Sequence, residues 1–162
     1  RTEADVSYDC YHPGGIVVAH RFLVLFLKEM GLHEWDVFEA LSPPCSMRRW
    51  GVDAAFRAME EELASGSLRW VTTAERGSGT LAIRIVTHGA VAAERDLIFD
   101  EAGARLIPAD TNAEPDRTLT FDAADFVLAC SGRLDPAEAV RSGRAQGALA
   151  VAESLSGRFT GM

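Results

Sequence analysis

The chain has 162 residues, enough for about one domain with a buried core, and its 48% hydrophobic and 25% charged residues are ordinary for a globular protein. Its formal charge is −8 and its sequence pI is about 5.0. Because phosphate binding needs clustered Lys and Arg, this balance weighs against nucleic acid as a main partner. A single lysine, Lys28, among many Ala, Arg, Gly and Glu residues is typical of a GC-rich, bacterial genome.

Cysteine content and hydropathy bear on the compartment. The cysteines Cys10, Cys45 and Cys130 are odd in number and widely spaced, so we expect no disulfide framework and a reducing environment. The longest apolar run covers residues 22–27, far fewer than the roughly 20 that span a bilayer. Since no signal-peptide layout is visible either, we expect a cytoplasmic protein without a transmembrane segment.

The N-terminal region begins with a polar, irregular stretch over residues 1–15 that ends in a Pro-Gly-Gly turn. The apolar segment that follows is compatible with a strand or a helix. Its β-branched residues 16–18 favour a strand at the front, whereas the Leu, Phe and Met content favours a nearly buried helix over residues 19–30. We choose the helix and expect it to stop at Gly31.

Two further helices are predicted before the first strand. Residues 33–41 place large apolar side chains on one face and charges opposite, and a Ser-Pro-Pro turn ends the helix. Residues 52–64 form the best helical pattern in the chain, with Asp53 as a candidate cap and an apolar stripe beside the acidic run 60–62. That acidic run is most simply a solvated helix face.

After Gly66 the hydrophobic period changes from 3.6 to 2, which indicates strands. The predicted strands cover residues 68–74, 80–87, 96–99, 104–107 and 118–121. The first two are predicted to form one hairpin, and the next two a second hairpin across a short Gly-containing turn.

Two short helices are predicted after the last strand. One covers residues 122–131 and stops at Gly132, and the next starts at Asp135-Pro136. Strands grouped together with helices at both ends are the α+β pattern. We therefore predict an antiparallel sheet of about five strands that is covered by helices on one face.

One local pattern within residues 118–147 resembles the sterol carrier protein-2 (SCP2) family. Its parts are Thr118-Leu119-Thr120, Asp122 and Asp125-Phe126, Gly132, Leu134-Asp135-Pro136, Ala139, and Gly143 with Gly147. The family usually has a basic stretch between its two final glycines, where this chain has Arg144-Ala145-Gln146. The resemblance covers residues of about 52–160, so we expect an SCP2-like lipid-binding domain at 52–162 and an N-terminal helical extension at 1–51.

The resemblance implies a lipid-binding α+β domain with an apolar tunnel between sheet and helices, and it implies no fixed catalytic residue. The residues expected to line such a pocket are Phe56, Met59, Leu63, Trp70, Leu81, Ile83, Ile85, Phe99, Phe121, Phe126 and Leu149. If these side chains fill one another, the domain is a closed core; if one layer is held off, they bind an apolar ligand. Composition does not distinguish the two, and for any single residue a core position is the better interpretation.

Histidines and cysteines offer a weaker case for metal or nucleophilic chemistry. Cys10, His12, His20, His33 and Cys45 are spread over distinct elements without a usual ligand spacing, so we predict no metal and no cofactor. Cys45 with His33, or Cys130 with His88, is formally a nucleophile pair. Burial as a small hydrophobe suits a free cysteine better, particularly Cys130 beside Phe126.

Charged motifs also have structural interpretations. The acids Asp122 and Asp125, like Asp135 and Glu138, are three residues apart as in a capping box, which suits them better than acid–base catalysis. The loop residues Arg48 and Arg49 are compatible with contact to an anionic head group or a partner, but a loop salt bridge is the better interpretation.

The main hypothesis is non-covalent binding or transport of a small hydrophobic molecule of the lipid, sterol, acyl or polyketide kind. One alternative is a small enzyme of a specialised biosynthetic pathway, with His88 or Asp96 as an acid–base group. Another is a regulator with a degenerate winged helix, whose wing would be the hairpin at 68–86; its acidic run 60–62 would repel DNA. The N-terminal helices could also form a homodimer.

Overall fold

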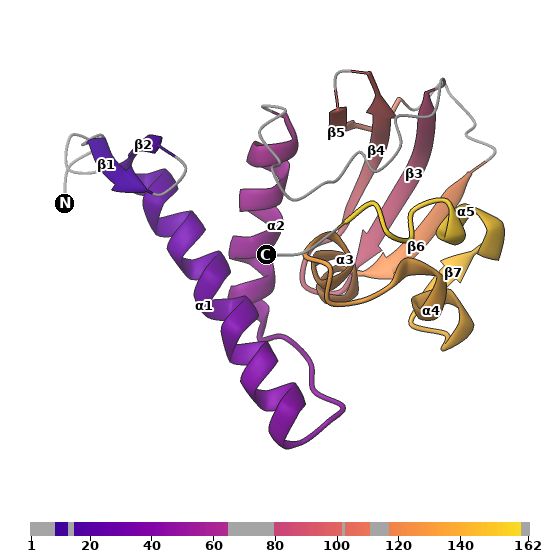
Figure 1. Cartoon of the computed structure of the whole chain (residues 1–162), viewed down its shortest axis with the longest axis horizontal. Helices are drawn as coiled ribbons and strands as arrows, with labels where there is room; N and C mark the ends of the chain where they lie inside the picture. The colour runs from indigo at the N-terminus through magenta and orange to yellow at the C-terminus, as the bar shows by residue number, and fades with distance from the viewer. Residues whose placement is uncertain (1–8, 13–14, 65–79, 102, 111–116, 160–162) are drawn as a thin grey trace. The chain divides into compact units, whose positions relative to one another are not determined.

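The structure is a computed structural model that describes residues 9–12, 15–64, 80–101, 103–110 and 117–159 (Figure 1). The chain divides into two compact units, Arg1–Ala58 and Met59–Met162, and each is described by itself. In the described ranges, no helix has the length and apolar character required to cross a bilayer.

The first unit begins with a β-hairpin. Strand β1 (Asp9–His12) pairs antiparallel with β2 (Gly15–Val18), with Cys10 opposite Val17. The prediction of an irregular stretch was therefore wrong for residues 9–12, because β1 has a polar sequence and is specified by its partner. The strand expected at residues 16–18 and the helix start at residue 19 are both confirmed.

Helix α1 (Ala19–Leu41) is continuous, although two helices were predicted. The predicted stop at Gly31 was wrong, and its reason is a tertiary contact. A Cβ atom added to Gly31 would lie 2.8 Å from the Cα atom of Gly51 in the next helix. The glycine thus serves a close approach of two backbones, which a sequence pattern cannot distinguish from a helix end.

Helix α2 (Arg49–Ala64) begins earlier than predicted and extends into the second unit. Its first turn is closed by the backbone N–H of Val52, which donates to the carbonyl of Arg48 at 3.0 Å. Asp53 therefore lies inside the helix and is not its cap. Its carboxylate instead pairs with Arg57, one turn later, at 3.4 Å.

The second unit contains a five-stranded sheet in the order β5-β4-β3-β6-β7. Its strands are β3 (Leu81–His88), β4 (Ala93–Asp100), β5 (Gly103–Pro108), β6 (Thr118–Asp122) and β7 (Ala145–Gly147). The predicted α+β class, with about five strands, helices and an N-terminal helix, is confirmed. The hairpin of β4 and β5 is confirmed as well, and both strands are longer than predicted.

Two details of the sheet differ from the prediction. Strand β6 runs parallel to β3. The two strands are not joined by a hairpin, because the chain passes through β4 and β5 and then crosses to the other side of β3. The fifth strand is β7, which pairs antiparallel with β6 and is only three residues long, too short for a periodic signal. The strand predicted at residues 68–74 lies outside the described residues.

The helices α3 (Ala123–Cys130), α4 (Pro136–Arg141) and α5 (Leu149–Glu153) follow β6. The predicted caps are confirmed: Asp122 accepts a hydrogen bond from the N–H of Ala124 at 2.9 Å, and Asp135 accepts one from the N–H of Glu138 at 2.9 Å. Asp125 does not complete a capping box by its side chain, which binds Arg144 at 2.5 Å.

One face of the sheet carries the core of the second unit. Its fully buried side chains include Ile83, Ile85, Leu97, Leu119 and Phe121. Helix α3 packs on this face, with the rings of Phe126 and Phe121 5.7 Å apart between centroids. The C-terminal segment covers the same face, where Phe159 contacts Phe99 edge-on at 6.0 Å. Helices and C-terminal segment thus close one side of the sheet.

Candidate functional site

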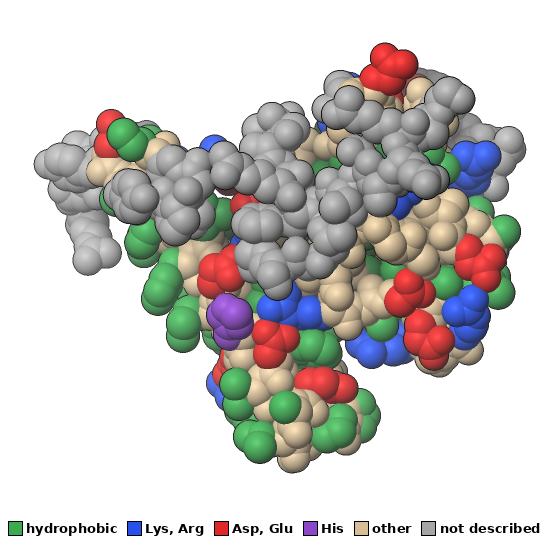
Figure 2. All heavy atoms as spheres, in the orientation of Figure 1, with side chains coloured by type: hydrophobic (Ala, Val, Ile, Leu, Met, Phe, Trp, Pro, Cys, Tyr) green, Lys and Arg blue, Asp and Glu red, His purple; other side chains and the backbone are tan. Residues whose placement is uncertain are grey.

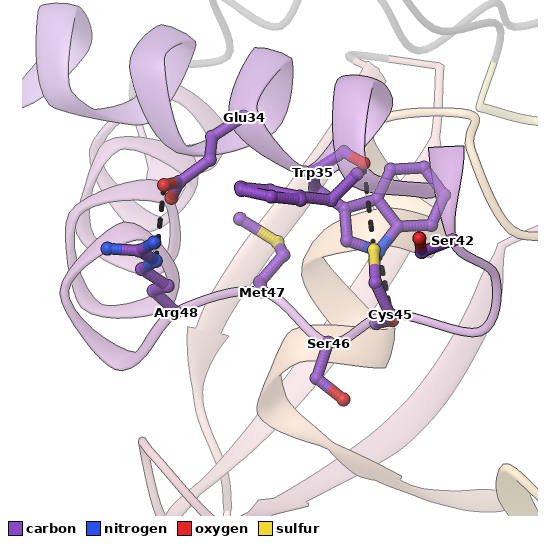
Figure 3. A pocket seen from close by; sticks show the side chains of 8 residues that line it. Glu34, Trp35, Ser42, Cys45, Ser46, Met47 and Arg48 are labelled. Atoms are coloured by element: carbon purple, nitrogen blue, oxygen red, sulfur yellow. Dashed lines mark hydrogen bonds and ion pairs between the residues drawn. The ribbon is translucent and has the colours of Figure 1, made fainter. Parts of the chain in front are cut away.

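A pocket lies in the first unit, between the second half of α1 and the loop that follows it (Figure 3). Its volume is about 190 Å³. The lining residues are Glu34, Trp35, Phe38, Ser42, Cys45, Ser46, Met47 and Arg48. The helix thus supplies one wall and the loop supplies the other.

Hydrogen bonds hold this loop against the helix. The indole N–H of Trp35 donates to the carbonyl of Cys45 at 3.3 Å, and the thiol of Cys45 lies 3.7 Å from the carbonyl of Trp35. The backbone N–H of Cys45 donates to the carboxylate of Glu39 at 2.9 Å. Because both polar ends of Trp35 are engaged, its ring is fixed as an apolar wall, and the side chain of Met47 is only 7% exposed beside it.

Charges at the pocket neutralise one another. The guanidinium of Arg48 is 3.1 Å from the carboxylate of Glu34, and it stands 6.0 Å from the ring centroid of Phe38. The salt-bridge interpretation of Arg48 is therefore confirmed. An anionic ligand would have to displace Glu34, so the arrangement favours an uncharged one.

The chemistry of the lining supports binding more than catalysis. Apart from Glu34 and Arg48, which pair with each other, the polar side chains are the hydroxyls of Ser42 and Ser46 and the thiol of Cys45. Among the described residues that line the pocket there is no histidine and no second carboxylate that could share a proton with Glu34. His33, once considered a partner for Cys45, contacts Glu29 and Asp36 on its own helix, at 3.8 and 3.3 Å.

The eleven residues predicted to line a tunnel occupy other positions. Those that the structure buries, none more than 6% exposed, are Phe56, Met59, Leu63, Ile83, Ile85, Phe99, Phe121 and Phe126. Leu81 is half-buried, and Trp70 lies outside the described residues. Leu149 is 38% exposed, contrary to its expected place under the helices, because the short helix α5 turns Ala152 toward the core instead.

Some of these buried side chains pack directly against other aromatic rings, as in the pairs Phe121–Phe126 and Phe99–Phe159. Their role in lining a ligand tunnel stays a prediction. The pocket itself was missed because it lies in the region outside the family resemblance. Its sequence signals were Trp35 and Phe38 on one helical face and the Pro-Pro turn after them. The packing of Met47 against that face is a tertiary contact, which a local pattern does not predict.

The acid–base candidates of the enzyme alternative do not converge. Asp96 accepts a hydrogen bond from Arg84 at 2.5 Å and another from the backbone N–H of Asp110 at 3.0 Å. His88 is exposed and lies 3.7 Å from Asp122, the residue beside it in the β3–β6 register. Arg84, which binds Asp96, is four residues from His88 along β3, so the two candidates are roughly 13 Å apart along the strand.

Asp96 is better explained as part of an ion-pair network around the buried Arg84. Burial of its carboxylate acts to raise its pKa, but the hydrogen bonds from Arg84 and Asp110 outweigh burial, and the pKa of Asp96 is lowered. Arg84 is itself only 6% exposed and also binds Glu94 at 2.6 Å and the carbonyl of Asp110 at 2.8 Å. The network ties β3, β4 and the segment after β5 together.

We expect the Asp96→Asn variant to be less stable than the wild type at neutral pH, with a difference that shrinks as the solution is acidified. Because the pKa of Asp96 is lower in the folded than in the unfolded protein, the carboxylate stabilises the fold fully at a pH above its unfolded pKa of about 4. This stabilisation is lost as the pH falls through the pKa of the folded state. Urea unfolding midpoints of both proteins between pH 7 and pH 2 test this. A difference that stays constant below pH 4 would contradict the network.

Cys130, the other cysteine considered as a nucleophile, has a structural role. Cys130 is 6% exposed on α3, and burial raises the pKa of its thiol, which disfavours the reactive thiolate. The interpretation of Cys130 as a buried hydrophobe is confirmed. Within the described ranges, no three His, Cys, Asp or Glu side chains are grouped in a way that would hold a metal ion.

The described residues thus form an α+β unit with a buried apolar core and a second unit, built on α1 and its following loop, with a small apolar pocket. A solved structure that it is similar to is the solution structure of the sterol carrier protein domain 2 of Helicoverpa armigera. The identity is 21%, the match covers 68% of this chain and 93% of that chain, and the TM-score is 0.36. No protein-family profile and no curated protein matches the chain.

Proposed function

We propose that the protein binds a small, uncharged apolar molecule non-covalently in the pocket between α1 and the loop 42–48. The observation that carries this proposal is a cavity of about 190 Å³ walled by Trp35, Phe38 and Met47. Of its lining residues that the structure describes, the two charged ones, Glu34 and Arg48, pair with each other. Burial of apolar surface supplies the free energy of binding, at about 25 cal/mol per Å².

The size of the cavity limits the ligand. Pockets for drug-sized molecules have volumes of about 300–1,000 Å³, whereas an apolar cavity of about 150 Å³ holds benzene. A volume of about 190 Å³ therefore suits a single ring system or the end of an acyl chain. A whole sterol would need additional space, such as a tunnel between the sheet and α3. Binding in such a tunnel is the broader lipid-binding hypothesis.

Binding should depend on the free volume beside Met47. With indole as the probe, we expect Met47→Trp to fill the pocket and weaken binding by about tenfold or more, a loss of about 1.4 kcal/mol. Met47→Leu nearly conserves the volume and serves as the control, so its affinity should stay within about threefold. Isothermal titration calorimetry measures both, and circular dichroism melting checks that each variant is folded.

Three results separate the possibilities. Loss of binding in Met47→Trp with retention in Met47→Leu supports the pocket. Equal affinity in both variants, together with methyl shifts of Ile83 and Ile85 in NMR spectra, would move the site to the sheet core of the second unit. Absence of saturable indole binding by the wild type would overturn the proposal.

A further inference from the structure

Helix α1 carries a long apolar stripe on its exposed side. The seven side chains of this stripe, each between 42% and 74% exposed, are Leu23, Phe26, Leu27, Met30, Val37, Phe38 and Leu41. With 3.6 residues per turn, they lie opposite Leu25 and Leu32, which are buried. Figure 2 shows hydrophobic side chains along the left edge of α1 in this view.

The spacing of the stripe is that of a helix–helix seam. Positions 23, 27, 30, 34, 37 and 41 alternate steps of four and three residues, as the a and d positions of a heptad repeat do. Five of the six are apolar, and the sixth is Glu34. Apolar residues that recur every 3.5 residues along a helix are typical of packing against another helix and not against a flat surface.

The charges of α1 argue against a membrane surface as the occupant. Helices that lie on membranes carry Lys and Arg along their polar face to meet anionic lipids. Here the lysine Lys28 is only 6% exposed and pairs with Glu29 at 3.4 Å. The second half of the helix is acidic, with Glu34, Asp36 and Glu39, so it would be repelled by an anionic bilayer.

The exposed area is of the size that a dimer needs. Seven large side chains, each about half exposed, present on the order of 600 Å². This lies at the upper end of the largest apolar patch on a typical monomer, about 300–600 Å², and approaches the roughly 800 Å² that each partner contributes to a stable interface.

Charge selects the orientation of such a dimer. In a parallel pair, each Glu34 would face the Glu34 of the other copy at the seam, and the acidic halves of both helices would lie side by side. In an antiparallel pair centred between residues 30 and 34, Leu23 faces Leu41, Leu27 faces Val37, and Met30 faces Glu34. This register keeps the carboxylates of the two copies apart and matches each apolar seam residue but one with an apolar partner.

We propose that α1 forms the interface of an antiparallel homodimer, in which the stripe packs against the same stripe of a second copy. The interface is isologous, as expected for a two-fold dimer. Phe38 belongs to the stripe and also lines the pocket, and Glu34, a position of the heptad seam, lines the pocket as well. The pocket and the dimer interface therefore share one wall.

Sedimentation equilibrium of the full chain tests the proposal, with an expected mass of twice 17.5 kDa. Leu27→Lys places a charge opposite Val37 and should raise the dimer dissociation constant by about a hundredfold or more, a change of about 2.7 kcal/mol. Ala40→Lys, exposed on the same helix beside the seam, is the matched control and should remain dimeric. Melting curves confirm that each variant is folded.

Met30→Lys decides the orientation. In the antiparallel register the new lysine faces Glu34 of the second copy, so this variant should stay dimeric. A parallel dimer would bring two lysines together at residue 30 and dissociate, and that outcome would overturn the antiparallel register. A wild-type chain that keeps the monomer mass throughout a concentration series would overturn the dimer itself, as would a dimer that Leu27→Lys leaves intact.

Discussion

Replacing Gly147 with alanine is expected to destabilise the second unit by about 3–5 kcal/mol. Gly147 has a φ of 138°, which side-chain-bearing residues rarely adopt. An added Cβ atom would also lie 2.5 Å from the carbonyl oxygen of Thr118 and 2.7 Å from a methyl group of Leu119. Since Leu119 is fully buried and faces Gly147 across the β6–β7 pairing, neither neighbour can move without disturbing the core.

Gly143 provides the matched control, four residues earlier. Its φ of 78° is also positive, but an added Cβ atom would meet nothing within 4 Å. Gly143→Ala should therefore cost only the backbone strain, roughly 1–2 kcal/mol. Free energies of unfolding from urea titrations compare the two variants. Equal losses would show that β7 does not approach β6 as closely as the structure has it.

Truncating Phe121 to alanine is expected to cost about 3–5 kcal/mol, which is typical of a large aromatic residue in a closed core. Phe121 is 1% exposed and contacts the ring of Phe126, which is equally buried. A side chain that lined a ligand tunnel would leave open space next to it and would cost less when removed. The loss of stability therefore separates the two roles that the sequence left open for this residue.

Leu149→Ala serves as the control for Phe121→Ala, because Leu149 is 38% exposed and should lose about 1 kcal/mol or less. The measurement is again the free energy of unfolding, in ligand-free protein and with octanoic acid present. A small loss in Phe121→Ala, combined with a loss of octanoic acid binding, would indicate a tunnel beneath α3 and not a closed core.

The elements best predicted from the sequence are those specified by neighbouring residues. The caps Asp122 and Asp135 bind backbone N–H groups two and three residues later, so a local pattern is enough to identify them. The alternation along residues 80–87 likewise predicts a strand, because one face of β3 is buried in the core.

The elements missed are those that depend on distant residues. Gly31 has the local signature of a helix stop, but its contact with Gly51 lies twenty residues away. Strand β7 is specified by the exposed edge of β6, and no three-residue period could indicate it. The pocket depends on Met47 returning to the face of Trp35 after a turn whose direction the sequence does not state.

The central claim is that an apolar ligand occupies the pocket between α1 and the loop 42–48, and intermolecular NOEs test it most directly. With indole bound to methyl-labelled protein, we expect cross-peaks from the ligand ring to the ε-methyl group of Met47 and to the ring protons of Trp35. Cross-peaks confined to Ile83, Ile85 and other core side chains of the second unit would contradict the claim.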